Sequence, residues 1–257
     1  MRYEILGSLR VVDEEKTLVI NARKMEVLLT TLLIRAGEVV SLDQLVTEIW
    51  NHNPPKRATD ALYVYIYQLR KLLTRPGRAE TPIVTRAPGY VLCPRDHEFD
   101  FWQFQQLVNE GRDAARANRP EQAATALGAA LDLCRGPILP ELRDGPIIAG
   151  FVTWLEELRL ECTEWFVESN LALGRHREMV RFLYGLVGEQ PLHEAFYRQL
   201  MQALYHSERR ADALKVYQMA RKTLQDELGL EPGRALRELQ QRILLADEPY
   251  GEHAAAG

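Results

Sequence analysis

Apolar and polar positions near the start of the chain first follow the pattern of β-strands and then the spacing of a helix. Residues 3–12 (YEILGSLRVV) and 16–20 (KTLVI) read as β-like runs, separated by the acidic, turn-like stretch Asp13-Glu14-Glu15. They predict a small antiparallel sheet. Residues 23–36 then carry apolar side chains at helical spacing, and Gly37 follows as a residue typical of helix ends. The pattern predicts a helix over 23–36 that Gly37 closes.

Two further helices are predicted in quick succession. Ser41-Leu42-Asp43-Gln44 is a capping box, in which the serine and glutamine side chains satisfy backbone N–H groups of the first turn. It opens a short helix over 42–50. After Pro54-Pro55, a longer helix is predicted over 56–73 (KRATDALYVYIYQLRKLL), because proline suits a helix start.

The long helix has two unlike faces. On a helical wheel one face is an apolar stripe, typical of a buried face: Ala58, Leu62, Tyr65, Ile66, Leu69 and Leu73. The opposite face mixes tyrosines and a valine with charges: Lys56, Asp60, Tyr63, Val64, Tyr67 and Lys71, with Arg57, Gln68 and Arg70 at its margins. Rings and hydroxyls among basic residues suit contact with sugar-phosphate and base edges. The alternative is a plain exposed face, or one packed on another domain.

A hairpin is predicted after the long helix. Arg75-Pro76-Gly77 breaks the chain, and residues 82–92 (PIVTRAPGYVL) form two β-branched runs around Ala87-Pro88-Gly89. Strands, two helices, a long helix and a hairpin are the order of a winged helix-turn-helix. In that fold the long helix enters the major groove, the helix before it crosses the backbone, and Arg86 beside the hairpin tip lies near the minor groove. A solvated hairpin charge is the alternative for Arg86.

The remainder is predicted to be helical. After a short polar linker at 96–100, helices are expected at 101–117, 120–134, 148–173, 176–188, 192–206, 209–228 and 232–246. GRHREMV (174–180) and ERRADAL (208–214) are offset by 34 residues, the period of tetratricopeptide repeats, and residues 118–123 make a similar joint. Stacked helix pairs of this kind leave a concave surface for a partner. An ordinary α-bundle is the alternative.

Composition narrows the class of protein. The 257 residues suggest two domains, and no run is apolar for long enough to cross a bilayer. The N-terminus has no signal-peptide design, and Cys93, Cys134 and Cys162 are too far apart for a CxxC motif, so we expect a cytoplasmic protein with reduced thiols. We expect no metal site and no cofactor, because the six histidines pair with no ligand at suitable spacing.

Charge is divided unevenly along the chain. Residues 1–95 hold 14 Lys and Arg against 10 Asp and Glu, a balance of +4, and residues 96–257 hold 18 against 26, a balance of −8. This asymmetry suits a nucleic-acid module joined to a protein-interaction module. An enzyme is not expected, since no Gly-rich phosphate loop or catalytic Ser/His/Asp or Cys/His signature is present. The rival is a helical-repeat adaptor whose N-terminal module binds protein and does not read DNA.

Four stretches together resemble a known family. They are YEILGSLRVV, the SLDQLVTEIW helix with the proline pair and long helix after it, TRAPGY in the hairpin, and ELGLEPGRALRELQQRIL near the end. In this order they resemble the Streptomyces antibiotic regulatory protein (SARP) family. The resemblance covers nearly the whole chain. It implies a mainly α fold with a small β component.

The resemblance also implies an arrangement and a function. It implies an OmpR-like winged helix-turn-helix DNA-binding domain at 1–95 and a bacterial transcriptional activation domain of tetratricopeptide-like helices at 96–246. From the sequence itself we expect a disordered tail at 247–257 and no ATPase segment after 246, which would make this a short member of the family. Such proteins activate biosynthetic gene clusters. They bind double-stranded DNA at direct repeats near the −35 region as side-by-side protomers, and they recruit RNA polymerase through sigma region 4, the β subunit and the α C-terminal domain.

Candidate DNA-binding residues follow from the face of the long helix together with the resemblance, which adds a basic pair before the first helix and the arginine beside the hairpin tip. They are Arg23, Lys24, Lys56, Arg57, Thr59, Tyr63, Tyr67, Gln68, Arg70, Lys71 and Arg86.

Overall fold

A computed structural model describes residues 1–14, 16–20, 22–51, 53–74, 81–94 and 97–245. Contacts divide the chain into two compact units, the first made of Met1–Asn109 and Gly128–Cys162, the second of Glu110–Leu127 and Thr163 onward. The first unit therefore continues past residue 95, and the domain boundary there stays a prediction. The predicted break at Arg75-Pro76-Gly77 and the predicted tail lie outside the described residues.

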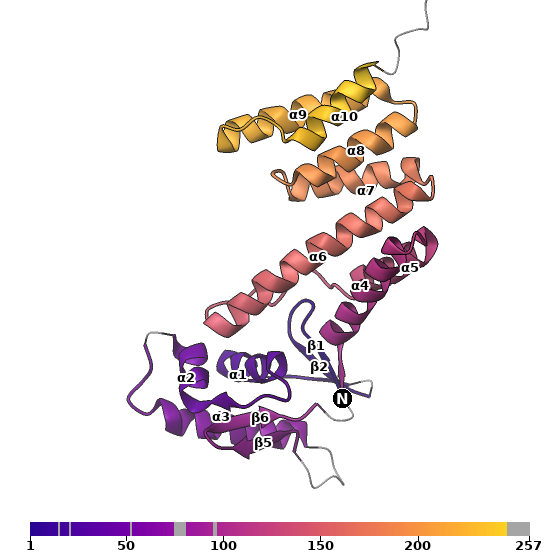
Figure 1. The fold of residues 1–257 in the computed structure, drawn as a ribbon. Coiled ribbons are helices and arrows are strands. Elements are labelled where there is room, and N and C mark those ends of the chain that lie inside the picture. The colour runs from indigo at the N-terminus through magenta and orange to yellow at the C-terminus, as the bar shows by residue number, and fades with distance from the viewer. Residues whose placement is uncertain (15, 21, 52, 75–80, 95–96, 246–257) are drawn as a thin grey trace, which may run out of the picture. The chain divides into compact units, whose positions relative to one another are not determined.

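The first unit contains the three helices predicted before the hairpin: α1 (Arg23–Ile34), α2 (Leu42–Trp50) and α3 (Ala58–Leu73) (Figure 1). The capping box is confirmed, because the Gln44 N–H donates to the Ser41 hydroxyl at 3.2 Å and the Ser41 N–H donates to the Gln44 side-chain oxygen at 3.0 Å. The predicted C-terminus of α1 is off by two residues. Arg35 is the C-cap, and Gly37, at a φ of +87°, instead donates its N–H to the Leu92 carbonyl at 2.8 Å.

A three-stranded antiparallel sheet completes the winged helix. The predicted hairpin is confirmed as β5 (Ile83–Arg86) and β6 (Gly89–Leu92), and β6 also pairs with β4 (Val40–Ser41), which the sequence pattern did not reveal. A Cβ at residue 89 would collide with the Val40 carbonyl oxygen, so the close approach of β4 to β6 requires glycine there. This contact anchors the hairpin to the chain just before α2.

The N-terminal sheet has four strands, in the order β3-β2-β1-β7: β1 (Arg2–Glu4), β2 (Arg10–Asp13), β3 (Lys16–Leu18) and β7 (Glu98–Phe99). The prediction of a continuous run over 3–12 is wrong, since β1 and β2 are separate strands paired antiparallel. The prediction of a polar linker at 96–100 is also wrong for its described part. Glu98 and Phe99 pair in parallel with β1, and Phe99 is buried.

A buried carboxylate explains why the first run breaks. Asp100, the first residue of α4 (Asp100–Arg116), accepts the backbone N–H groups of Ile5 and Leu6 at 2.9 to 3.0 Å. Those N–H groups therefore point at a side chain instead of a neighbouring strand. Burial raises the pKa of Asp100, while the two N–H donors and the nearby Arg135 guanidinium oppose that rise. The first loop of the chain is thereby fixed to the start of α4.

A second buried carboxylate holds the start of α6 (Pro146–Ala172). Glu48 of α2 is 2% exposed, and its two oxygens accept the N–H groups of Ile147 and Ile148, both at 2.8 Å. These N–H groups belong to the first turn of α6, where no intrahelical partner exists. A Cβ at Gly145 would collide with the Glu48 carboxyl group, so glycine permits the approach. Glu48 thus serves as the N-cap of a helix about a hundred residues away in sequence.

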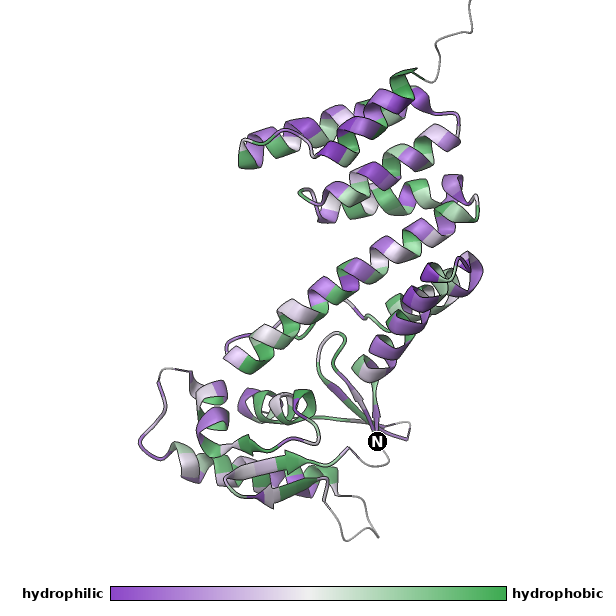
Figure 2. Cartoon of the chain, viewed as in Figure 1, coloured by the Kyte–Doolittle hydropathy of each residue, from purple (hydrophilic) through white to green (hydrophobic). Residues whose placement is uncertain are grey.

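The second unit is helical, as predicted. Its helices are α7 (His176–Glu189), α8 (Glu194–His206), α9 (Arg210–Leu228) and α10 (Arg234–Leu245), together with the end of α4, the start of α5 (Pro120–Asp132) and the end of α6. Helix α8 packs against α7, α9 and α10, and each of these helices mixes hydrophobic and hydrophilic residues (Figure 2). No helix in the described part of the chain is long and apolar enough to cross a membrane.

Three helix joints in the second unit have the same backbone turn. Residues Asn118, Gly174 and Glu208 all have left-handed φ values, of 56°, 76° and 64°. The next residue in each joint donates its N–H to a carbonyl five positions back, a bond typical of the Schellman turn: Arg119 to Ala114, Arg175 to Asn170 and Arg209 to Leu204, at 2.9, 3.1 and 2.9 Å. Ala213, Tyr217 and Ala220 are buried, and they lie where tetratricopeptide repeats place small and aromatic packing residues. The repeated turn agrees with tetratricopeptide-like helix pairs.

Replacing Glu48 by alanine should destabilise the first unit. The change leaves the N–H groups of Ile147 and Ile148 without their acceptor, and buried donors left in this way cost about 1–3 kcal/mol. Urea unfolding of the full chain, followed by circular dichroism, measures the loss. Thr47→Ala is the matched control, because Thr47 is the exposed neighbour on α2. Equal stability of the two variants would contradict the capping role.

Candidate nucleic-acid interface

The long helix α3 has the two faces that its sequence predicted. Ala58, Leu62, Ile66, Leu69 and Leu73 are buried, and Tyr65 is half-buried. On the opposite face large apolar side chains stand in solvent, with exposed fractions of 48% for Tyr63, 52% for Val64 and 68% for Tyr67. Exposure of several large apolar side chains on one helix face is unusual for a solvated face and is typical of a binding surface. We call this face of α3 the reader face.

Polar and basic side chains surround these rings. The candidates Lys56, Arg57, Thr59, Gln68 and Lys71 are all exposed on or just before α3. Among the residues that the structure describes, the side chains of Lys56, Arg57 and Lys71 form no ion pair or hydrogen bond with another side chain. Their charges are therefore available to an anionic partner. Long basic side chains beside exposed aromatic rings suit contact with phosphates and bases together.

The hairpin adds a further exposed cation, Arg86, to those of α3. Arg86 is the last residue of β5 and is exposed, as are Thr85, Ala87 and Pro88 around it. The hairpin strands are held in a sheet by β4, so the tip projects from a fixed base. Within the described residues Arg86 has no ion-pair partner. The structure thus brings a second basic group to the same winged-helix module.

Arg70 behaves differently from its neighbours. Its guanidinium donates to the Ile83 carbonyl at 3.0 Å and to the Thr85 hydroxyl at 2.9 Å, and it lies 5.6 Å from the centre of the Tyr90 ring. Burial raises the pKa of Tyr90, and the Arg70 charge opposes that rise. The structure places this candidate as a link between α3 and the hairpin. Sequence alone gave no sign of the link, because the hairpin register was unknown.

The basic pair at the start of α1 also has internal partners. Arg23 forms an ion pair with Asp144 at 2.6 Å, in the loop that precedes α6. The Lys24 ammonium lies 5.1 Å from the centre of the Trp50 ring, a cation–π arrangement. Both side chains remain exposed. Arg23 and Lys24 therefore support the junction of α1, α2 and the loop before α6, and their exposed groups stay accessible to other partners.

Fold and site together define a class of protein: a winged helix-turn-helix transcriptional regulator with a helical activation domain. Residues 15–92 match the family model "Transcriptional regulatory protein, C terminal", and residues 99–244 match "Bacterial transcriptional activator domain". The chain belongs to the Streptomyces antibiotic regulatory protein family of transcriptional activators.

Relatives of known name agree with this assignment. The regulatory protein DnrI of Streptomyces peucetius is 35% identical, over 96% of this chain and 93% of its own length. The transcriptional regulatory protein EmbR of Mycobacterium tuberculosis is 35% identical over 94% of this chain, which spans only 63% of the length of EmbR. A solved structure of M. tuberculosis EmbR in complex with a low affinity phosphopeptide superposes with a TM-score of 0.88 at 34% identity, covering 95% of this chain and 64% of that one. These relatives are transcriptional regulators.

Comparison of Arg70→Ala with Lys71→Ala should show that Arg70 stabilises the fold whereas its exposed neighbour Lys71 does not. Arg70→Ala removes two hydrogen bonds to the hairpin and should lower the free energy of unfolding by about 1–2 kcal/mol. Lys71→Ala, at an exposed site without a partner in the described residues, should change it by less than about 0.5 kcal/mol. Urea unfolding compares the two variants. Equal losses would show that Arg70 does not fix the hairpin.

Proposed function

We propose that this protein is a sequence-specific activator that reads double-stranded DNA with the reader face of α3. The observation that carries the proposal is that face itself, where Tyr63, Val64 and Tyr67 are exposed among basic side chains that have no ion-pair partner in the described part of the chain. Family membership supports it, since one family model covering 15–92 describes transcriptional regulatory proteins. A DNA-binding domain at 1–95 and an activation domain at 96–246 are part of the proposal.

Each candidate residue takes a role from its position. On the reader face, Tyr63, Tyr67 and Gln68 contact base edges in the major groove, where base identity is readable. Phosphate contacts come from Lys56, Arg57, Thr59 and Lys71, and they set the register of α3 on the duplex. Arg86 at the hairpin tip reaches the minor groove. A change in the rings therefore alters sequence preference, whereas a change in the cations weakens binding to every sequence.

Arg23, Lys24 and Arg70, the three candidates with internal partners, also contribute to DNA binding. Arg70 fixes the hairpin, and so the position of Arg86, through its bonds to Ile83 and Thr85. Arg23 and Lys24 approach phosphates while keeping their own contacts. A guanidinium has five N–H donors in a planar fork, so Arg23 can hold Asp144 and a phosphate oxygen together. DNA binding is thereby joined to the junction before α6.

Two protomers bind side by side on direct repeats near the −35 region. A module with a balance of only +4 over residues 1–95 binds one site weakly, and a second protomer on the adjacent repeat raises the effective concentration. The helical domain then recruits RNA polymerase, with sigma region 4, the β subunit and the α C-terminal domain as partners. Its balance of −8 over residues 96–257 complements basic surfaces on such partners.

The target is a secondary-metabolite gene cluster, in keeping with a family named for antibiotic regulation. Deletion of the gene should remove transcripts of the cluster that the protein controls, and re-expression should restore them. Re-expression of a Tyr67→Ala variant should not restore them. Unchanged transcripts throughout the surrounding genes after deletion would contradict this assignment of the target.

Binding to a duplex with two direct repeats from the gene neighbourhood tests the reader face. Tyr67→Ala and Arg86→Ala should each weaken binding about tenfold or more, since a base contact is worth ~1–3 kcal/mol. For the wild type, log K should fall against log salt with a slope of ~0.9 per phosphate contact. Fluorescence anisotropy at several salt concentrations provides both quantities.

Matched controls come from the second unit. Tyr184 on α7 is an exposed tyrosine, and Arg181 on the same helix is an exposed arginine, so Tyr184→Ala and Arg181→Ala make the same chemical changes away from the reader face. They should leave the affinity for the duplex unchanged. Wild-type affinity in Tyr67→Ala and Arg86→Ala, or no binding even at low salt, would contradict the proposal and favour the protein-binding adaptor.

A further inference from the structure

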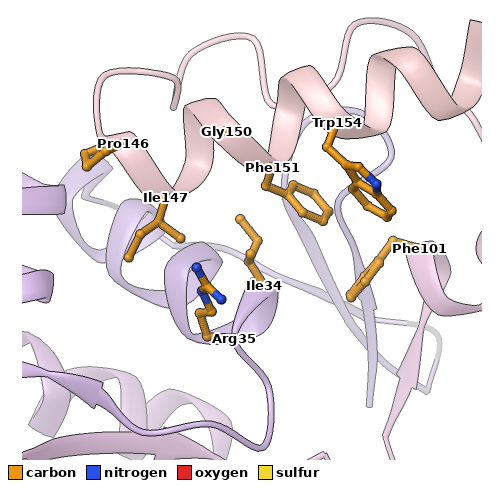
Figure 3. Close-up of a pocket in the computed structure, with 8 residues that line it drawn as sticks. All are labelled: Ile34, Arg35, Phe101, Pro146, Ile147, Gly150, Phe151 and Trp154. Atoms are coloured by element: carbon orange, nitrogen blue, oxygen red, sulfur yellow. The ribbon is translucent and has the colours of Figure 1, made fainter.

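An open hollow of about 440 Å³ lies in the first unit, apart from the reader face. Figure 3 shows side chains from three helices converging on it, from the end of α1, the start of α4 and the first turns of α6. We call it the aromatic hollow and define it by Ile34, Arg35, Phe101, Gly150, Phe151 and Trp154. A hollow of this size is within the range that holds small organic ligands.

Three aromatic side chains, Phe101, Phe151 and Trp154, line the hollow. The Phe101 and Phe151 rings lie edge to face at 5.4 Å between centres, and the Phe151 and Trp154 rings lie 5.6 Å apart. Trp154 is nevertheless 42% exposed, although a tryptophan beside two phenylalanines would ordinarily be covered. The exposed Trp154 ring, with the half-buried Phe151 ring beside it, offers area to another flat ring, and stacked or edge-to-face ring pairs gain about 0.5–1.5 kcal/mol beyond area burial.

Two further features decide the chemistry and the size of an occupant. Arg35 lies at the rim and is exposed. Among the described residues its guanidinium makes one side-chain hydrogen bond, from one nitrogen to the Glu38 carboxylate at 3.4 Å. Most of its five N–H donors therefore remain available to a ligand. Gly150 lies in the lining on α6, and a Cβ there would meet nothing within 4 Å. The wall is therefore apolar, the rim is cationic, and there is unfilled space beside α6.

We propose that the aromatic hollow binds a small, flat aromatic molecule that carries one negative charge. The rings of Phe151 and Trp154 cover its apolar face, and the Arg35 guanidinium binds its anionic group. The occupant bridges α1 of the winged helix and the first turns of α6, which Glu48 also joins to α2. Bound ligand therefore stabilises that junction, and the proposal adds a ligand site to the DNA-binding role without depending on it.

The anionic dye 1-anilinonaphthalene-8-sulfonate is a suitable probe, because it is flat, aromatic and singly charged. Its fluorescence should rise saturably with one site per wild-type chain, and bound dye should raise Tm as its concentration increases. Gly150→Leu fills the hollow and should weaken binding at least tenfold. Gly185→Leu is the matched control, since Gly185 is a helical glycine of α7 where an added Cβ also meets nothing, and it should bind the dye as wild type does.

Charge recognition needs its own comparison. Arg35→Gln should weaken the sulfonate dye about fivefold or more, yet leave binding of the uncharged analogue N-phenyl-1-naphthylamine unchanged. Circular dichroism and Tm without dye confirm that each variant is folded. Wild-type dye affinity in Gly150→Leu, equal effects of Gly150→Leu and Gly185→Leu, or the absence of saturable binding would each overturn the proposal. Equal losses of both dyes in Arg35→Gln would overturn the assignment of a negative charge.

Discussion

The buried carboxylate of Glu48 is the constraint on which the arrangement of the first unit depends. The Glu48 side chain projects from α2, which packs against α3. Its two oxygens accept hydrogen bonds of 2.8 Å from backbone N–H groups in the first turn of α6. A carboxylate removed from water needs such donors, and the unpaired N–H groups of a helix N-terminus need such an acceptor. The buried carboxylate and the N–H groups of α6 would therefore each lower the stability of the fold if the other were absent. The winged helix and the start of α6 belong to one compact unit, and Arg23 and Asp144 add an exposed ion pair nearby.

A second buried carboxylate, that of Asp100, also accepts backbone N–H groups from a distant part of the chain. Asp100 accepts the N–H groups of Ile5 and Leu6, which ties the N-terminal sheet to α4. The two carboxylates thus tie the N-terminal sheet and the winged helix to the first turns of α4 and α6. The reader face needs no such neighbour, since α3 already has a buried stripe and a hairpin held by Arg70. The exposed side chains of the reader face and the two buried carboxylates are therefore different residues of the same unit, and the aromatic hollow lies beside α6, which Glu48 caps.

Prediction from the sequence succeeded where the governing interactions are local. The capping box at Ser41, the apolar stripe of α3 and the hairpin around Ala87-Pro88-Gly89 each depend on residues within a few positions of one another. Prediction failed where a residue's partner is far along the chain. The run over 3–12 looked continuous because nothing local shows that the Ile5 and Leu6 N–H groups bind Asp100. Arg70 resembled its exposed neighbours for the same reason, since its acceptors are on a strand whose register the sequence does not state.

Amphipathic spacing and turn chemistry by themselves determined the helices of this protein and the exposed rings of the reader face, whereas the family resemblance came from four particular stretches of sequence. These features arise from the period of the helix and the conformational preferences of single residues, which are encoded locally. Only the tertiary structure decided that Glu48 is buried, that Arg23 and Arg70 have internal partners, and that Phe101, Phe151 and Trp154 gather around an open hollow. A charged side chain reads as solvated in any sequence, because burial becomes favourable only when distant parts of the chain supply its hydrogen bonds.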